Sequence, residues 1–248
     1  MDLSKYSIVL LSAGVGKRLG SIGKTKPKCL LKVNKKTLIE RLLYILKKRN
    51  AKKVTIIVGY KKDVLINYLK KIKSLELNYI SVKKFRKYGH ACSWHSFKNE
   101  WIKDKKPLLL FHTDIFFNPI FLDNILKSKK QDIIGTKSQN KALLKENSFV
   151  VKTNKVNRIF SIDRYIKNKV SNREILGINK LSKKMTKKIF SFMDKYLIKD
   201  KKYLSWEDFI SFFIKKTKSS IYTLNNQKFF WININKYKDY ISIKNLKF

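Results

Sequence analysis

Apolar residues in the first half of the chain form short continuous runs that alternate with segments of helical spacing. Continuous runs are typical of strands buried on both faces of a parallel sheet, and they place strands at 6–11, 53–59, 77–82 and 107–111. Between the first two, a helix begins at Thr37, which forms a capping box with Glu40. The alternation predicts an α/β fold with a doubly wound, mixed but mostly parallel sheet.

Other helix signals extend this pattern along the chain. Asp63 is expected to cap a helix that runs to Ile72, and Asn118 and Pro119 are expected at the N-cap and first position of another. The weaker pattern beyond residue 130 predicts strands at 131–136, 148–153 and 156–162, a strand ending near Gly177, and helices at 183–198 and 205–217. We see no linker or repeat, and expect a single domain over 1–248.

The charge is the most unusual feature of the composition. The 248 residues carry 58 Lys plus Arg against 17 Asp plus Glu, a formal net charge of +41. Such an excess is typical of proteins that bind polyanions. Only seven of the cations are arginines, however, and lysine is a residue with A/T-rich codons, so genomic base composition is an equal explanation. We expect no nucleic-acid partner, although a basic nucleic-acid-binding protein stays an alternative.

The number of cysteines and the length of the apolar runs indicate the cellular compartment. Two cysteines, Cys29 and Cys92, are too few for a disulfide framework. The N-terminus has no signal-peptide pattern, and no apolar run approaches the ~20 residues of a membrane span. We therefore expect a cytoplasmic protein without membrane contact. A homodimer is compatible with this sequence.

The first apolar run leads directly into a glycine-rich loop. Residues 11–19 read Leu-Ser-Ala-Gly-Val-Gly-Lys-Arg-Leu, and residues 26–28 read Lys-Pro-Lys. Ligands of open α/β sheets bind at the carboxyl ends of strands. There the two glycines let backbone amides approach a phosphate, and Arg18 and Lys28 can neutralise its charge. The loop satisfies neither the P-loop nor the dinucleotide-binding pattern.

These two segments resemble the signature L-x-A-G-x-G-x-R-L followed by K-P-K of nucleotidyltransferases, which join a nucleoside triphosphate to a phosphorylated sugar or small alcohol. The resemblance implies a Rossmann-like domain of the glycosyltransferase-A-like type, with a nucleotide-binding half at 1–130 and an acceptor-binding half at 131–248. It further implies that Arg18 faces the leaving pyrophosphate and that Lys28 bridges the phosphates of both substrates. The nucleotide-binding residues that it implies are Leu11, Ala13, Gly14, Val15, Gly16, Lys17, Gly59, Gly89 and Ser93. His90, Cys92 and His95 would suit zinc, but no fourth ligand is evident nearby.

Later segments resemble the same family in the same order. Asp114 follows the strand at 107–111, where the family has an aspartate that holds Mg²⁺. The segment 175–182 resembles G-I-x-K-L-S of the phosphocholine cytidylyltransferase branch, which implies CTP. The acceptor-binding residues implied by these matches are Asp163, Arg164, Gly177, Trp206 and Glu207.

The chain departs from the family near residue 230. The family has acidic residues that complete the metal site where this chain has Asn233 and Asn235. An amide oxygen can ligate Mg²⁺ but brings no negative charge. The expected magnesium site is therefore Asp114 with these two asparagines, and a family member that binds nucleotide without turnover is an alternative.

The expected reaction is attack of an acceptor phosphate on a nucleoside triphosphate with release of pyrophosphate. The acceptor stays open between a phosphorylated small alcohol, a phosphonate and a sugar 1-phosphate. Aromatic residues could form a cage for a quaternary ammonium, although aromatics at such places are more often core. The candidates for this cage are Trp94, Tyr203, Trp206 and Trp231.

Overall fold

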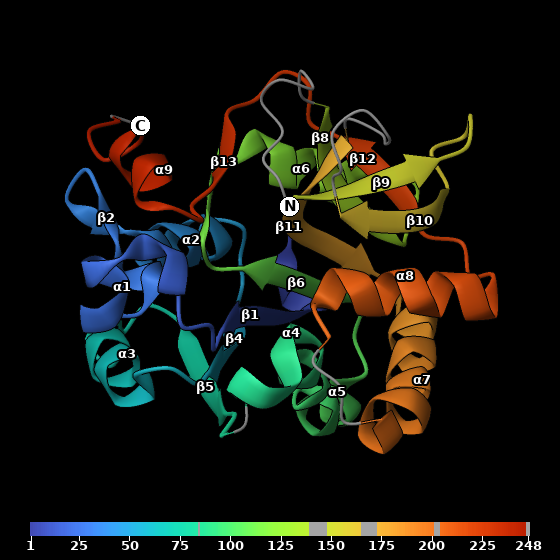
Figure 1. Ribbon diagram of the computed structural model, residues 1–248, viewed down its shortest axis with the longest axis horizontal. Helices are drawn as coiled ribbons and strands as arrows, with labels where there is room; N and C mark the ends of the chain where they lie inside the picture. The colour runs from blue at the N-terminus through green and yellow to red at the C-terminus, as the bar shows by residue number, and fades with distance from the viewer. Residues whose placement is uncertain (84, 139–147, 165–172, 201–203, 247–248) are drawn as a thin grey trace.

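The computed structural model describes residues 1–83, 85–138, 148–164, 173–200 and 204–246 (Figure 1). Its centre is a mixed sheet with the strand order β10-β9-β11-β6-β1-β4-β5, and β8 and β12 continue it beside β11. The parallel part contains β1 (Ser7–Ser12), β4 (Lys53–Val58), β5 (Glu76–Ser81) and β6 (Leu108–His112). The other strands are β8 (Ile133–Ser138), β9 (Phe149–Thr153), β10 (Ile159–Arg164), β11 (Arg173–Leu181) and β12 (Tyr222–Asn225).

Strand β11 joins the two parts of the sheet. It pairs antiparallel with β6 through its last residues and with β8 along most of its length. Strand β12 then adds to β8 in parallel. The α/β fold and the mixed sheet expected from the sequence are therefore confirmed.

Helices cover both faces of the sheet because its central strands are apolar on both sides. Ile8 and Leu10 belong to one buried cluster and Val9 belongs to the other, as the alternation of side chains along a strand requires. The first cluster packs under α2 (Leu38–Lys47), α3 (Lys62–Leu69) and α6 (Ile120–Lys127). The second packs under α4 (Phe85–His95), α5 (Lys98–Asp104), α7 (Lys183–Asp200) and α8 (Trp206–Thr217). The described helices include none with the length and apolar character needed to cross a bilayer.

A smaller third cluster lies beside the sheet, at the left of Figure 1. It packs η2 (Lys17–Leu19) and α1 (Ser21–Thr25) against the C-terminal helix α9 (Tyr237–Ile241). Helix η3 (Lys28–Leu30) lies between them in the sequence and buries Cys29 and Leu30 in the first cluster. The remaining short elements are η1 (Leu3–Lys5), the pair β2 (Lys32–Val33) and β3 (Lys36–Thr37), and the pair β7 (Ile115–Phe117) and β13 (Trp231–Asn233). This cluster packs residues 19–38 against residues 232–246.

Local predictions had mixed outcomes. The Thr37–Glu40 capping box is confirmed. The Asp63 cap is wrong, because Lys61 occupies the N-cap in a left-handed conformation with φ 46°. The N-cap of α6 is Pro119, one residue later than expected, although Asn118 Oδ1 does accept a hydrogen bond from the Ile120 amide at 3.0 Å. The strand expected to end near Gly177 continues to Leu181.

Candidate active site

The loop after β1 forms one wall of a cavity of about 630 Å³ at the carboxyl ends of the parallel strands. Residues 11–18 line it, as do Lys28 and Asp114. Gly16 allows the loop to turn, because it has φ 65° and a side chain there would be strained. The ends of β1 and β6 are joined by a hydrogen bond of 2.9 Å from the Ser12 hydroxyl to the Thr113 hydroxyl. The loop and Asp114 are therefore held at adjacent strand ends.

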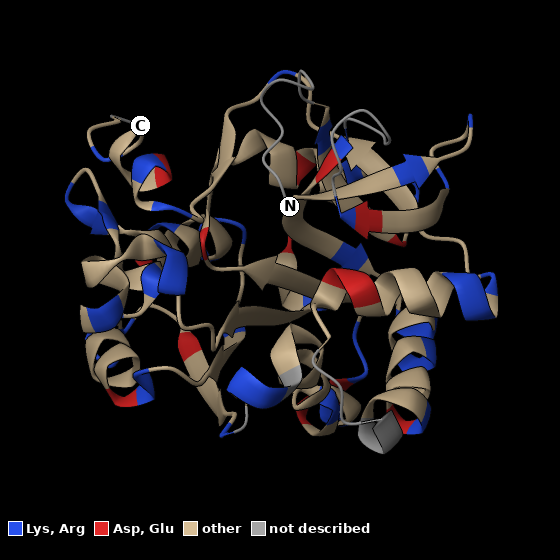
Figure 2. Cartoon of the chain, in the orientation of Figure 1, with Lys and Arg blue, Asp and Glu red and all other residues tan. Residues whose placement is uncertain are grey.

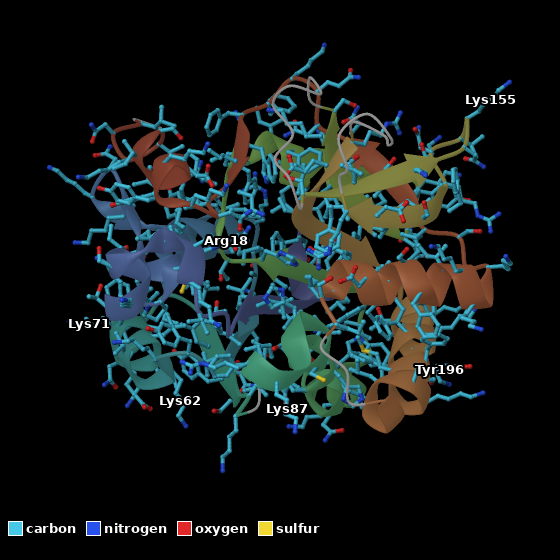
Figure 3. All side chains as sticks on the ribbon, viewed as in Figure 1. Arg18, Lys62, Lys71, Lys87, Lys155 and Tyr196 are labelled. Carbon is cyan, nitrogen blue, oxygen red and sulfur yellow. The ribbon has the colours of Figure 1, made fainter. Side chains whose placement is uncertain are left out.

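Four side chains from distant parts of the sequence meet in this cavity. The Lys28 ammonium donates to Asp114 Oδ2 at 2.7 Å and lies 3.4 Å from Asn235 Oδ1. The Arg18 guanidinium donates to the same Asn235 oxygen at 3.0 Å. Figure 3 shows Arg18 near the middle of the molecule, whereas Lys62, Lys71 and Lys155 extend from its periphery. The two cations predicted to bind phosphates thus lie side by side.

The charge of Asp114 depends on this arrangement. Burial alone would raise the pKa of Asp114, but the ammonium of Lys28 and the nearby His112 outweigh it and lower the pKa to about 2. The carboxylate is therefore ionised at neutral pH.

The short sheet of β7 and β13 places the two asparagines beside Asp114. Asn233 pairs with Ile115, and the Ile234 amide donates to the Asp114 carbonyl at 2.9 Å. Asn233 Oδ1 is buried and has no hydrogen-bond partner in the described part of the chain. Asn235 is fixed by its backbone amide, which donates to Asp239 at 2.9 Å. An unused oxygen acceptor therefore lies next to the site's main carboxylate.

The cavity lining also contains buried acidic side chains. Glu174 and Glu207 line it, and both residues are only 8% exposed. The Ser148 hydroxyl donates to Glu174 at 2.7 Å. Arg164 also lines the cavity, where it stacks on the Phe149 ring at 4.5 Å and contacts Asp208 at 3.2 Å.

Two histidines also line the cavity. The rings of His90 and His112 have centroids 6.3 Å apart, and both line the cavity. Desolvation lowers the pKa of both imidazoles. Burial raises the pKa of Glu207, an effect that the nearby His90 opposes.

The structure places several expected site residues behind the cavity wall. Trp206 is fully buried, packs edge-on against His112 at 6.2 Å and does not line the cavity, so its contact with the acceptor stays a prediction. Gly177 has φ 76°, and a side chain there would meet His112 Cβ at 2.9 Å, so this glycine makes room for His112 rather than for a ligand. Asp163 accepts a hydrogen bond from Ser161 at 2.8 Å and does not line the cavity.

The two other glycines serve packing in the same way. A side chain at Gly59 would meet Phe85 at 2.7 Å, and one at Gly89 would meet the Leu204 carbonyl at 2.3 Å. Ser93 does line the cavity. The close approach at Gly89 joins α4 to the start of α8, so these glycines shape the wall.

The aromatic cage and the zinc site do not form among the described residues. Trp94 and Trp206 are fully buried and 6.1 Å apart. Trp231 is 6% exposed and donates to the Leu176 carbonyl at 3.1 Å. Tyr203 lies outside the described residues. Across the described ranges, no three His, Cys, Asp or Glu residues cluster as a metal site would require.

The sequence did not identify several cavity residues. His112 and Glu174 carry no motif, and they reach the cavity because β6 and β11 are neighbours in the sheet. The one available signal was rarity: two of the three histidines and three of the seventeen acids line this cavity.

Comparison with known proteins agrees with this geometry. The profile of the MobA-like NTP transferase domain matches residues 8–145, which include the glycine loop, Lys28 and Asp114. The chain belongs to the MobA-like NTP transferase family. The second half, from β9 onward, lies outside the matched domain.

Curated relatives of this MobA-like chain carry related names. A CTP:phosphoglutamine cytidylyltransferase of Campylobacter jejuni is 27% identical over 50% of this chain and 49% of its own length. A bifunctional sugar-1-phosphate nucleotidylyltransferase/acetyltransferase of Sulfurisphaera tokodaii is 28% identical over 92% of this chain and 52% of its own. A choline-phosphate cytidylyltransferase of Streptococcus pneumoniae is 35% identical over 37% and 39%. The chain thus spans about half or less of the length of these relatives.

Solved structures confirm the fold of the MobA-like chain. The CTP:phosphocholine cytidylyltransferase of Streptococcus pneumoniae aligns over 96% of this chain and 97% of its own, with a TM-score of 0.78 and 22% identity. The inositol-1-phosphate CTP transferase of T. maritima aligns over 94% and 90%, with a TM-score of 0.78 and 20% identity. The expected nucleotidyltransferase fold is confirmed.

Proposed function

We propose that this chain transfers a nucleoside monophosphate, preferentially from CTP, to a phosphorylated small alcohol, a phosphonate or a sugar 1-phosphate, and releases pyrophosphate. The observation that carries the proposal is the meeting of Arg18 and Lys28 at Asn235, in a cavity lined by the glycine loop. Two cations beside a glycine loop suit a polyphosphate. The preference for CTP is supported by two curated relatives that are named cytidylyltransferases.

The reaction in this proposal is an in-line displacement at phosphorus. An oxygen of the acceptor phosphate forms a bond to the α-phosphorus, and the bond from that phosphorus to the pyrophosphate oxygen breaks. The attacking dianion needs no general base, so the protein acts by positioning and by neutralising charge. Arg18 would stabilise the leaving pyrophosphate, and Lys28 would contact the phosphates on both sides of the forming bond.

Magnesium belongs to this proposal. The carboxylate of Asp114 and the unpartnered Oδ1 of Asn233 are oxygen donors of the kind that Mg²⁺ prefers. A site with only these two protein ligands suits Mg²⁺, because this ion usually keeps several waters and binds substrate phosphates. When bound, the ion would neutralise charge on the phosphates.

The test is a pyrophosphate-release screen. It crosses CTP, UTP, GTP, ATP and dTTP with phosphocholine, phosphoethanolamine, 2-aminoethylphosphonate and a panel of sugar 1-phosphates, with and without Mg²⁺. We expect release with CTP and at least one acceptor, and loss of release when EDTA removes Mg²⁺. No release from any pair would overturn the proposal.

The Lys28→Ala and Asp114→Ala variants test the assigned residues. Each should lower kcat/KM by about 100-fold or more, because each removes a charge that acts on the reacting phosphates. Lys24→Ala and Asp104→Ala are matched controls, because both residues are exposed and outside the cavity lining. Near-normal turnover of either site variant would contradict the assignment.

Asn233 and Asn235 favour a second candidate, a protein that binds nucleotide without turnover. Two amides give the site less negative charge than two carboxylates would. If the screen finds nucleotide binding but no pyrophosphate release, and Asn233→Asp or Asn235→Asp introduces release, the second candidate replaces the first.

A further inference from the structure

Three hydrogen-bonding side chains converge at the α8 end of the cavity. His90, His112 and Glu207 all line it, and the two imidazole centroids are 6.3 Å apart. His112 Nε2 is buried and, among the described residues, has no hydrogen-bond partner. A buried polar atom without a partner is costly. This atom is therefore expected to find its partner in a ligand.

Glu207 adds an unmatched negative charge. Its side chain lies at the start of α8 and is only 8% exposed. No lysine or arginine in the described ranges forms a salt bridge with it, although the chain has 58 such cations. A buried carboxylate is stabilised by a paired cation. The cavity thus presents a carboxylate and an unpartnered imidazole nitrogen to the same ligand.

The cation that fits is one with N–H donors. A primary ammonium has three N–H donors and no acceptor, so it can satisfy a carboxylate and neutral imidazole nitrogens together. A quaternary ammonium has no N–H donor and is bound by open aromatic faces. Trp94 and Trp206 are fully buried. The two phenylalanine rings that line the cavity already have an arginine guanidinium over them, Arg86 at 5.8 Å from Phe85 and Arg164 at 4.5 Å from Phe149. The cavity therefore lacks the open aromatic faces that a quaternary ammonium needs among the residues described.

We propose that the acceptor carries a protonated primary amine, whose N–H groups are bound by His112, Glu207 and His90. This inference rests on the proposed function, since it concerns the acceptor of that reaction. The two histidines and Glu207 line the same cavity as Arg18 and Lys28, so the amine lies in the cavity that also holds the phosphate-binding cations. A short linker between amine and phosphate follows, as in a small aminoalkyl phosphate or phosphonate.

Calorimetric binding tests this inference without any turnover. The matched probes are phosphoethanolamine and phosphocholine, which differ only in three N-methyl groups, each titrated into the full chain with and without CTP and Mg²⁺. We expect phosphoethanolamine to bind about 10- to 100-fold more tightly, the range for hydrogen bonds to charged groups. Equal or tighter binding of phosphocholine, or no binding of phosphoethanolamine, would overturn the inference.

Two variants test whether the named residues cause the preference for phosphoethanolamine over phosphocholine. Glu207→Gln and His112→Phe, which keeps a ring but removes both nitrogens, should each reduce the preference about 10-fold or more. His95→Gln should leave it unchanged, because His95 is bound to Asp194 at 2.8 Å and does not line the cavity. If the two variants weaken CTP binding and leave the preference intact, these groups serve the nucleotide and the inference is wrong.

The outcomes separate this inference from the proposed function. A preference for the primary amine without pyrophosphate release from any pair would retain the amine site and contradict the activity. Release with sugar 1-phosphates, but neither binding nor release with the aminoalkyl compounds, would retain the activity and contradict the amine site.

Discussion

Asp114 and Lys28 show how one contact sets the charge of the site. Lys28 lies at 2.7 Å from a carboxylate that is mostly buried, and this contact helps to keep the carboxylate ionised. An isolated carboxylate in the same place would be penalised by desolvation. The pair thus holds the lysine in the cavity before any phosphate arrives.

Acid titration of stability should report this pair. Because the pKa of Asp114 falls from 3.8 to about 2 on folding, the carboxylate stabilises the protein above about pH 4, and this contribution is lost as the pH falls towards 2. At neutral pH, Asp114→Asn should lower the free energy of unfolding by about 2 kcal/mol. Urea unfolding of both proteins should show the difference shrinking across that window. Asp104→Asn, an exposed control, should show no such change, and a pH-independent difference for Asp114→Asn would contradict the explanation.

Glu207 should behave in the opposite way. Its pKa is raised above 4.5 by burial, so its ionised form destabilises the folded state at higher pH. We expect Glu207→Gln to raise the free energy of unfolding near pH 8, because the substitution removes a carboxylate that burial destabilises. This gain should disappear as the pH falls through the raised pKa towards 4.5, because the wild-type carboxyl is then protonated in the native state. Denaturant unfolding against pH measures it, and destabilisation at pH 8 would contradict the prediction.

Strand β11 is the element whose conformation leaves room for a cavity residue of its neighbour β6. Its Gly177 interrupts the extended conformation with φ 76° and leaves space for His112 of β6. The register between β11 and β8 also shifts between Ile175 and Asn179. A bulge at this point lets one strand pair with two neighbours, and Gly177 leaves room for His112 at the cavity.

Two glycine variants distinguish the loss of stability caused by backbone strain from the loss caused by a steric contact with His112. Gly177→Ala should lower the free energy of unfolding by about 2 to 4 kcal/mol, because it adds both backbone strain and a 2.9 Å contact with His112. Gly20→Ala adds strain alone, since Gly20 has φ 64° and nothing within 4 Å of the added Cβ, and should cost about 1 kcal/mol. Urea unfolding of both variants is the measurement. Equal losses would show that the contact with His112 carries no energy.

The elements differ in how well the sequence predicted them. The apolar runs of β1, β4 and β6 are long and buried on both faces, so their pattern needs no knowledge of neighbours. Helix α4 was missed because Gly89 interrupts it and its apolar spacing is short. β13 was missed because three residues show no periodicity and are stabilised by pairing with the distant β7. Motif residues could be predicted for the site, whereas His112 and Glu174 depend on strand neighbours that only the fold reveals.

At the scale of the whole molecule, the cationic residues are spread over the periphery. Figure 2 shows lysine and arginine on most helices and loops, with few acids between them. The cavity lining mixes both signs, with Arg18, Lys28 and Arg164 beside the buried acids Glu174 and Glu207. The charge of +41 therefore acts on anionic substrates mainly as a long-range field.

Salt dependence should distinguish this field from a polyanion-binding surface. Raising salt from about 50 mM to about 200 mM should weaken CTP binding by less than about tenfold, since the site's own contacts are short-range. A protein that binds duplex DNA through many phosphate contacts loses about a thousandfold or more over the same range. Titrations with CTP and a DNA duplex give both slopes. DNA binding that persists at ~150 mM salt would favour the nucleic-acid alternative.

The pairing of β13 with β7 has a consequence for the order of synthesis. Asn233 and Asn235 reach Asp114 only after more than a hundred further residues have been translated. A ribosome-bound chain can form β1, β4 and β6 early, yet its cavity stays open on the side that β13 later closes. A nascent chain stalled before residue 230 should therefore resist proteolysis at its parallel strands while it has no complete nucleotide site. Catalytic competence would then arrive only after β13 has been translated and has paired with β7, when most of the core has already formed.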